Sequence, residues 1–259
     1  MASTGIGWRA WLAALFGARR ADVPPHLRKP RIRERGTTTE LQFARGVSQS
    51  AMVTRDPQRL LIDYTRTMLG ALVFVPRPRR IGMIGLGGGS QAKYCYRHLS
   101  EAQIEVVENN PHVLALRRQF HVPDDDARFR VFLDDGARFL HERAGRYDLL
   151  LVDGYDETGI PEALSTQAFY DDCRAALTEG GAMAANLYCA DAAAHVERLQ
   201  RAFGASSVLV MEEPRQSNRV AFAWTGPVTT GEGDMTLSSA AQRDLRAVFG
   251  TVREAFAAR

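Results

Sequence analysis

Residues 79–90 read Arg-Arg-Ile-Gly-Met-Ile-Gly-Leu-Gly-Gly-Gly-Ser, and this stretch decides the fold. Its first half is a short apolar run, which is typical of a strand covered on both faces of a sheet. The second half contains the glycines Gly85, Gly87, Gly88 and Gly89. Glycines allow a tight turn and a close approach of the backbone to a ligand. A helix that begins at Ser90 would point its free N–H groups at that ligand. The alternative is an ordinary turn between a strand and a helix.

The next predicted strand covers residues 103–108 and ends in Glu108. It follows the glycine turn by about twenty residues, the spacing at which nucleoside-binding α/β domains place a carboxylate for the ribose hydroxyls. Glu108 is therefore a candidate ribose ligand. The alternative is a solvated carboxylate at a strand end, and the glycine turn upstream favours the ribose.

Composition places the chain among ordinary globular proteins. Its 259 residues are 45% hydrophobic and 24% charged, which suits one sizeable domain with a small appendage. The net charge of +3 is too small to indicate a nucleic-acid partner, and no apolar run has the length of a membrane span. The cysteines at 95, 173 and 189 lie far apart without disulfide or zinc spacing, so we expect no metal and a cytoplasmic location.

The chain divides into four predicted parts, which differ in the spacing of their apolar and turn residues. They are a tail (1–30), a small β unit followed by a helix (31–75), a Rossmann-like nucleoside-binding domain (76–226), and a linker with a C-terminal helix (227–259). The β unit is predicted from short alternating runs at 31–35, 38–43 and 47–53, and the helix after it opens at Asp56-Pro57.

Strands and helices alternate through the third part. The predicted strands are 80–86, 103–108, 129–134, 147–153 and 181–188, with helices at 90–99, 111–120, 136–144, 165–177 and 191–203 between and after them. This βα repeat predicts a doubly wound, mainly parallel sheet. Two last strands, 207–212 and 218–225, suggest an antiparallel hairpin at its edge.

Carboxylates follow three of these strands, at the edge where open α/β sheets bind ligands. Asp135 could accept a hydrogen bond from an adenine amino group, with Gly136 letting the ring approach, or it could simply cap the next helix. Asp153 could take a proton from an ammonium group and free an amine nucleophile, with Asp156 facing the same pocket. The alternative for this pair is turn capping. Residues 157–161 are a candidate lid.

Taken in order, these motifs resemble the spermidine synthase, or polyamine aminopropyltransferase, family across roughly residues 32–224. The matching segments are 46–49, 85–89, 107–111, 135–136, 147–156, 160–164 and 169–170. The resemblance implies a small N-terminal β domain before a methyltransferase-like Rossmann domain, in a homodimer or homotetramer. It also implies transfer of an aminopropyl group from decarboxylated S-adenosylmethionine, a co-substrate that is not permanently bound, to an amine.

The resemblance assigns roles to individual residues. Glu108 would hold the ribose, Asp135 and Gly136 the adenine, and Gln49 would line the nucleoside pocket. Asp153 would be the proton acceptor and would bind the amine together with Asp156.

Three departures concern the substrate side, and one is that the family's Pro-Thr-Tyr-Pro segment, which helps hold the polyamine, has no match near residues 218–224. The family's glycine turn continues with an aspartate that contacts the donor's amino group, and Ser90 stands there in this chain. Where the family carries a Tyr-Gln/His-Glu-Met segment, this chain has Thr65-Arg66-Thr67-Met68, with Tyr64 one residue out of step. Arg66 would bring a positive charge near a cationic substrate unless it points away.

Two alternatives to aminopropyl transfer therefore stay open. One is a methyltransferase that uses intact S-adenosylmethionine, in which Arg66 could pair with the methionine carboxylate. The other is a catalytically silent homologue that binds a nucleoside or oligomerises. Fold class alone does not separate these functions.

Overall fold

A large sheet forms the centre of the computed structural model, which describes residues 23–43, 48–156, 159–213, 218–228, 230 and 234–259. Within these residues the sheet has seven strands in the order β6-β5-β4-β7-β8-β10-β9. Their bounds are β4 Arg80–Ile84, β5 Gln103–Glu108, β6 Phe129–Leu133, β7 Tyr147–Val152, β8 Leu177–Leu187, β9 Val208–Glu212 and β10 Arg219–Trp224. β4 pairs in parallel with both β5 and β7, so the strand order reverses beside it. β10 runs antiparallel to both β8 and β9, which confirms the predicted hairpin and the doubly wound sheet.

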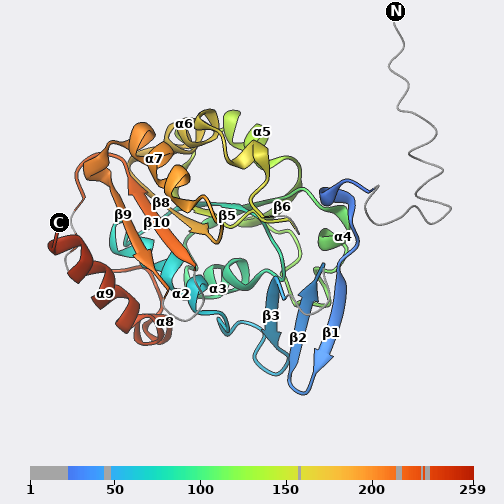
Figure 1. The fold of residues 1–259 in the computed structure, drawn as a ribbon. Helices are drawn as coiled ribbons and strands as arrows, with labels where there is room; N and C mark the ends of the chain where they lie inside the picture. Colours follow the sequence, from blue (N-terminus) through green and yellow to red (C-terminus); the bar gives the residue numbers. More distant parts are fainter. Residues whose placement is uncertain (1–22, 44–47, 157–158, 214–217, 229, 231–233) are drawn as a thin grey trace, which may run out of the picture.

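Helices cover both faces of this sheet (Figure 1). On one face lie α5 Gly136–His141, α6 Gln167–Ala176 and α7 Ala192–Phe203. On the other lie α2 Asp63–Met68, the 3-10 helix η3 Leu69–Val73, α3 Ser90–His98, α8 Ser239–Asp244 and α9 Arg246–Ala257. Side chains of β7 alternate between the two cores: Leu149 and Leu151 pack on the α3 face, and Leu150 and Val152 pack on the α6 face. This double burial explains the uninterrupted apolar run of the strand.

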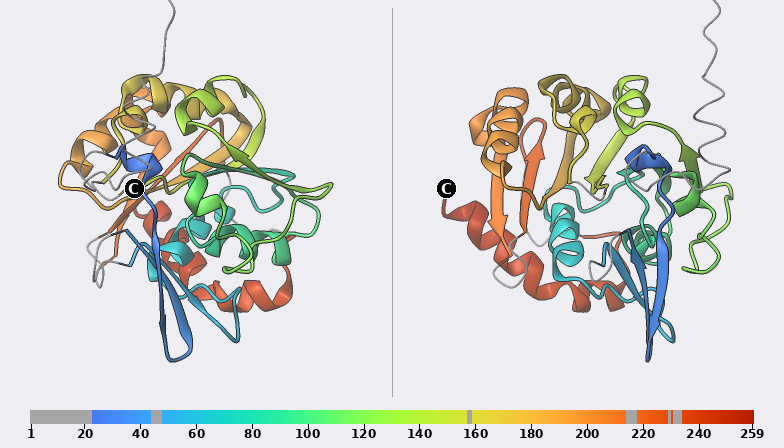
Figure 2. Two further views of the ribbon diagram at one scale, coloured as in Figure 1. Left: turned by 90° about the vertical axis from the view of Figure 1, so that its right-hand side faces the viewer. Right: turned by 45° about the vertical axis from the view of Figure 1, so that its right-hand side comes forward.

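A second, three-stranded antiparallel sheet precedes the large one in the part of the chain described here. It consists of β1 Arg31–Arg35, β2 Thr38–Gln42 and β3 Ser50–Val53, and it projects away from the large sheet in both views of Figure 2. The predicted β unit is therefore confirmed. Residues 1–22 of the predicted tail and residue 47, the start of the third predicted strand, lie outside the described residues.

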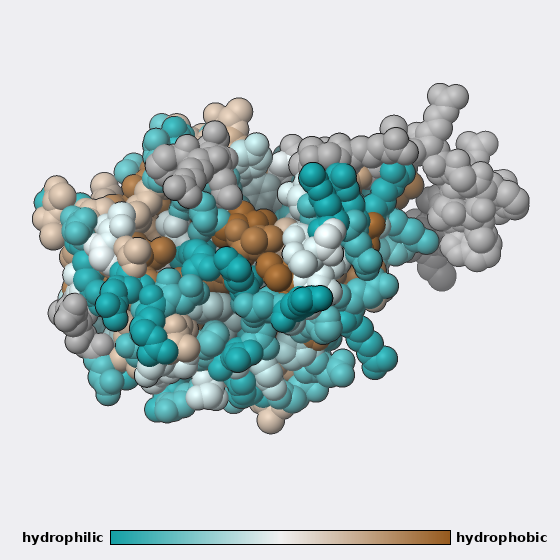
Figure 3. All heavy atoms as spheres, turned by 90° about the horizontal axis from the view of Figure 1, so that it is seen from below, coloured by the Kyte–Doolittle hydropathy of each residue, from teal (hydrophilic) through white to brown (hydrophobic). Residues whose placement is uncertain are grey.

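The face seen from below is mostly hydrophilic, with a group of hydrophobic residues exposed near its centre (Figure 3).

Two predicted helices are wrong in extent. The helix expected from Asp56 begins only at Asp63, because the backbone N–H of Asp56 bonds the carbonyl of Val53 and closes a tight turn there. The helix expected over 111–120 is cut to α4 Pro111–Leu114. The chain then continues as turns up to His121, whose φ of 53° lies in the left-handed region and cannot continue a helix. The C-terminal helix is divided into α8 and α9 at Leu245.

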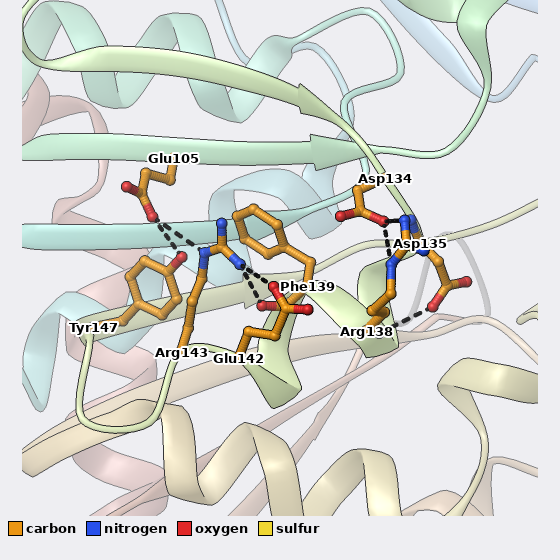
Figure 4. Close-up of polar contacts among 8 residues, drawn as sticks. All are labelled: Glu105, Asp134, Asp135, Arg138, Phe139, Glu142, Arg143 and Tyr147. Carbon is orange, nitrogen blue, oxygen red and sulfur yellow. Dashed lines mark hydrogen bonds and ion pairs between the residues drawn. The ribbon is translucent and has the colours of Figure 1, made fainter.

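Two glycines let the backbones and side chains of β4 and its neighbours approach closely. A Cβ on Gly82 would stand 3.0 Å from the ring of Tyr147, which crosses β4 to donate its hydroxyl to Glu105 on β5 (Figure 4). A Cβ on Gly85 would stand 2.3 Å from the carbonyl oxygen of Asp153, and Gly85 has a φ of +94°. Side chains at these two positions would push apart the strands at the point where their order reverses.

We expect Gly85→Ala to destabilise the protein far more than Gly36→Ala. Both glycines have positive φ values, which costs an alanine about 1–2 kcal/mol, but a Cβ on Gly36 meets nothing within 4 Å. Gly85→Ala adds a clash with backbone atoms, so its loss should exceed that of Gly36→Ala by about 2 kcal/mol or more. Urea unfolding of both variants and the wild type measures the difference, and equal losses would show that the close approach at Gly85 is not required.

Candidate functional site

A cavity of about 1390 Å³ opens at the carboxyl ends of β4, β7 and β8, against the N-terminal β unit. This is the crevice in which open α/β sheets bind ligands, because the strand order reverses between β4 and β7. Its walls come from the β unit, the glycine turn, the start of α3 and the segments after β7 and β8. The lining includes Glu40, Gln49, Ser50, Tyr64, Gly85, Leu86, Gly87, Ser90, Gln91, Asp153, Tyr155, Asp156, Asn186, Tyr188 and Asn218.

The four glycines of the turn do different things. Gly85 and Gly87 line the cavity, and a Cβ on Gly87 would make an ordinary van der Waals contact with Ser50 at 3.7 Å. Gly88 and Gly89 face inward, where a Cβ would stand 2.6 Å from Ser50 Oγ or 2.4 Å from Val122 Cγ2. Only the first part of the turn, Gly85 to Gly87, therefore lines the cavity, whereas Gly88 and Gly89 are needed for close packing.

Glu108 lies beside the glycine turn but not on the cavity wall. It is 9% exposed, and its carboxylate accepts hydrogen bonds from the backbone N–H groups of Leu86 at 3.0 Å and Asn110 at 2.9 Å. Burial raises the pKa of this carboxyl, and the backbone donors oppose that rise. Glu108 thus holds the turn in shape, and its contact with a ribose stays a prediction.

Asp135 caps α5, as one of the two interpretations of the sequence expected. Its Oδ1 accepts from the backbone N–H groups of Ala137 and Arg138, each at 3.0 Å. Arg138 also forms an ion pair with Asp134 and offsets one of the two carboxylates that follow β6 (Figure 4). A Cβ on Gly136 would stand 2.7 Å from Ile84 Cγ2, so the close approach here is to a core side chain. Neither Asp135 nor Gly136 lines the cavity, and their contact with an adenine stays a prediction.

Asp153 is the carboxylate at the centre of the cavity wall. The Tyr64 hydroxyl donates to its Oδ2 at 3.0 Å, and the Asn186 amide donates to its Oδ1 at 2.9 Å. Asn218 in turn donates to Asn186 Oδ1 at 2.8 Å, and both amides are buried. Burial raises the pKa of Asp153, and the hydrogen bonds from Asn186 and Tyr64 act in the opposite direction. The result is a fixed carboxylate that is more basic than an exposed aspartate.

Tyr64 remains a donor in this arrangement. Burial, followed by the nearby charge of Asp153, raises the pKa of its phenol well above the usual value. Gln49 donates from Nε2 to the carbonyl of Asp156 at 2.9 Å, which ties the β unit to the segment after β7. Ser90 and Asp156 also line the cavity as expected, whereas residues 157–158 of the candidate lid lie outside the described part of the chain.

Arg66 does not line the cavity. It stands two residues after Tyr64 on α2, about 200° around the helix, so the two side chains leave on different sides. Its guanidinium donates to the carbonyl of Leu60 and pairs with Asp244 at 2.6 Å. The position of Arg66 therefore does not support the expectation that it contacts the substrate, and its positive charge does not lie on the cavity wall.

A group of polar residues after β8 is absent from the residues predicted from the sequence. Those predictions concern the ends of β4, β5, β6 and β7, and the end of β8 is not among them. Asn186 is the last polar residue of β8, and Cys189, Asp191 and His195 follow on the same cavity wall. One ligand atom from each of these last three lies within 4.8 Å of the others. The wide spacing of the cysteines in sequence predicts no metal site, yet the fold brings Cys189 together with a carboxylate and an imidazole.

The charge of the lining favours a cationic ligand. Glu40, Asp153, Asp156 and Asp191 contribute carboxylates, against Arg35 on the basic side. Excess negative charge in a cleft attracts cations and raises their local concentration.

In the described residues, no helix combines the length and the apolar character that crossing a bilayer requires.

Comparisons with known proteins identify a family for this chain. A family model described as the spermine/spermidine synthase domain matches residues 63–201. A polyamine aminopropyltransferase of Chromobacterium violaceum is 35% identical over 175 residues, which cover 66% of this chain and 67% of that protein. One from Neisseria meningitidis serogroup A is 34% identical over 191 residues, which cover 72% of each.

Among solved structures, the chain is similar to a probable spermidine synthase from Corynebacterium glutamicum. The TM-score is 0.66 at 19% identity, and the match covers 87% of this chain and 89% of the other. At this identity the likeness concerns the fold, which is a mostly parallel sheet preceded by a small antiparallel one.

Proposed function

Because this chain belongs to the spermine/spermidine synthase family, we propose that it is an aminopropyltransferase. It transfers the aminopropyl group of decarboxylated S-adenosylmethionine to an amine acceptor and releases methylthioadenosine. The observation that carries the proposal is the fixed, basic carboxylate of Asp153 in an acidic cavity at the point where the strand order reverses. We further propose that the chain acts in the cytoplasm as a homodimer or homotetramer.

The nucleoside of the donor belongs at the glycine turn. Gly85, Leu86 and Gly87 line the cavity there, opposite Gln49 and Ser50 of the β unit. Binding would let Glu108 exchange a backbone partner for the ribose hydroxyls, and Asp135 keeps a second oxygen beyond the one that caps α5.

The reaction needs an uncharged amine. An acceptor amine is protonated in water near neutral pH, so it must lose a proton before it can attack, and the raised pKa of Asp153 suits it to accept that proton. The nitrogen then forms a bond to the carbon beside the sulfonium, and the C–S bond breaks with its electron pair on sulfur. The leaving group is a neutral thioether, so most of the catalysis comes from alignment and from the charges of the wall.

Ser90 changes one part of this site. It can hydrogen-bond the amino group of the donor, but it carries no charge to neutralise an ammonium. Asp153 and Asp156 on the same cavity supply negative charge in its place. The acidic lining disfavours the carboxylate of intact S-adenosylmethionine, and Arg66, which could have paired with that carboxylate, is held by Asp244.

The first prediction concerns donor choice. We expect decarboxylated S-adenosylmethionine to bind at least about tenfold more tightly than S-adenosylmethionine, a difference of about 1.4 kcal/mol, because only the latter brings a carboxylate into the acidic cavity. Isothermal calorimetry with both compounds and with methylthioadenosine measures this. A preference for the intact compound would overturn aminopropyl transfer, and binding of none would leave the cavity without a nucleoside function.

A second prediction concerns the proton acceptor. Asp153→Asn keeps the size of the side chain and its bond from Asn186, and the Tyr64 hydroxyl can turn to accept from the new NH2 group. Because the base is gone, transfer with an amine acceptor should fall about 10²–10⁴-fold while methylthioadenosine still binds. Asp172→Asn is the matched control, because Asp172 contacts His141 outside the cavity. Full activity of the Asp153 variant would contradict its role.

A third prediction concerns the pH profile. The reaction requires ionised Asp153, so kcat/KM rises with pH through the pKa of this group. Asn186→Leu removes a donor that lowers that pKa, and the acidic limb of the profile should therefore move to higher pH. A lower rate with an unmoved limb would mean that Asn186 matters for structure alone.

A further inference from the structure

Three side chains that commonly bind metals converge where the chain leaves β8 and enters α7. Cys189 lies in the connecting segment, Asp191 directly precedes α7, and His195 is in its first turn. Their ligand atoms all lie within 4.8 Å of one another, and the three residues share the cavity wall with Asp153. The set offers one sulfur, one oxygen and one nitrogen.

The histidine is oriented as a ligand would be. Its Nδ1 lies 2.7 Å from the hydroxyl of Tyr170, which fixes the ring, and both side chains are almost fully buried. Its Nε2 points to Asp191 Oδ2 at 3.7 Å, which is too long for a hydrogen bond. Metal-binding histidines characteristically use one ring nitrogen for the ion and the other for such a neighbour.

We propose that Cys189, Asp191 and His195 bind one divalent transition-metal ion, with Zn²⁺ as the best chemical match. Zn²⁺ accepts thiolate, imidazole and carboxylate ligands at about 2.0–2.3 Å, which places tetrahedral ligand atoms roughly 3.3–3.8 Å apart. The observed separations, all within 4.8 Å, need to shorten by about 1.5 Å at most, and the Asp191 side chain is 65% exposed. Mg²⁺ and Ca²⁺ prefer oxygen ligands alone, so this mixed set disfavours them.

Because all three residues line the cavity, a fourth ligand could reach the ion from there. Three protein ligands with an open position are the arrangement of zinc sites that bind water or a small molecule. The ion would lie beside the segment that follows β8, whereas the donor nucleoside is proposed to bind at the glycine turn. The inference does not rest on the proposed transferase activity, and its test does not use that activity.

The experiment is metal binding by the purified full-length chain, freed of any affinity tag and treated with a chelator. We expect one Zn²⁺ per chain in competition with a chromophoric indicator. Co²⁺ in its place should give a thiolate charge-transfer band in the near ultraviolet. Cys189→Ser should abolish that band, and Asp191→Asn, at an exposed position that tolerates the change, should weaken Zn²⁺ binding at least about tenfold.

Two further variants separate a site from general metal affinity. Tyr170→Phe removes only the hydroxyl that orients His195 and should weaken binding about 10–100-fold. His141→Gln, which removes an exposed histidine that contacts Asp172, should change nothing. Zn²⁺ should also raise the melting temperature of the wild type but not of Cys189→Ser. Absence of stoichiometric binding, a Co²⁺ spectrum without the thiolate band, or binding that survives the Cys189 and Asp191 changes would each overturn the proposal.

Discussion

The close contact between β4 and the segment after β7 is the constraint on which the site depends. The backbone N–H of Asp153 bonds the carbonyl of Ile84 at 2.9 Å, and no side chain fits between Gly85 and the Asp153 carbonyl. This contact places the glycine turn and the Asp153 carboxylate side by side, at the edge where the strand order reverses.

The surroundings of Asp153 balance two opposing requirements. Burial makes the carboxyl a stronger base, but a buried charge without partners is costly. Tyr64 and Asn186 satisfy its two oxygens, and Asn218 fixes Asn186. These partners come from α2, β8 and the start of β10, so the reactivity of one side chain is set by elements spread through the chain.

Sequence reasoning succeeded where a local pattern determines the structure. Apolar runs identified the strands, and alternation identified the β unit, since both reflect burial of neighbouring residues. It failed where two contacting residues are distant in sequence, and where the direction of a side chain depends on its position around a helix. Asn186 contacts Asp153 across 33 residues, and Arg66 leaves α2 on the side away from the cavity. It could not decide between cap and ligand for Asp135, because one aspartate suits both roles and only coordinates show which groups its oxygens contact.

The polar group after β8 could not be recognised from the sequence either. Cys189, Asp191 and His195 are spaced by two and four residues, which matches no familiar metal motif, and they converge only because the chain turns from β8 into α7 between them. A carboxylate so placed serves a cationic cavity ligand equally well when no ion is bound. The thiol and the oriented imidazole favour a metal, because an ammonium group is held best by carboxylates, whereas a zinc ion binds thiolate, imidazole and carboxylate together.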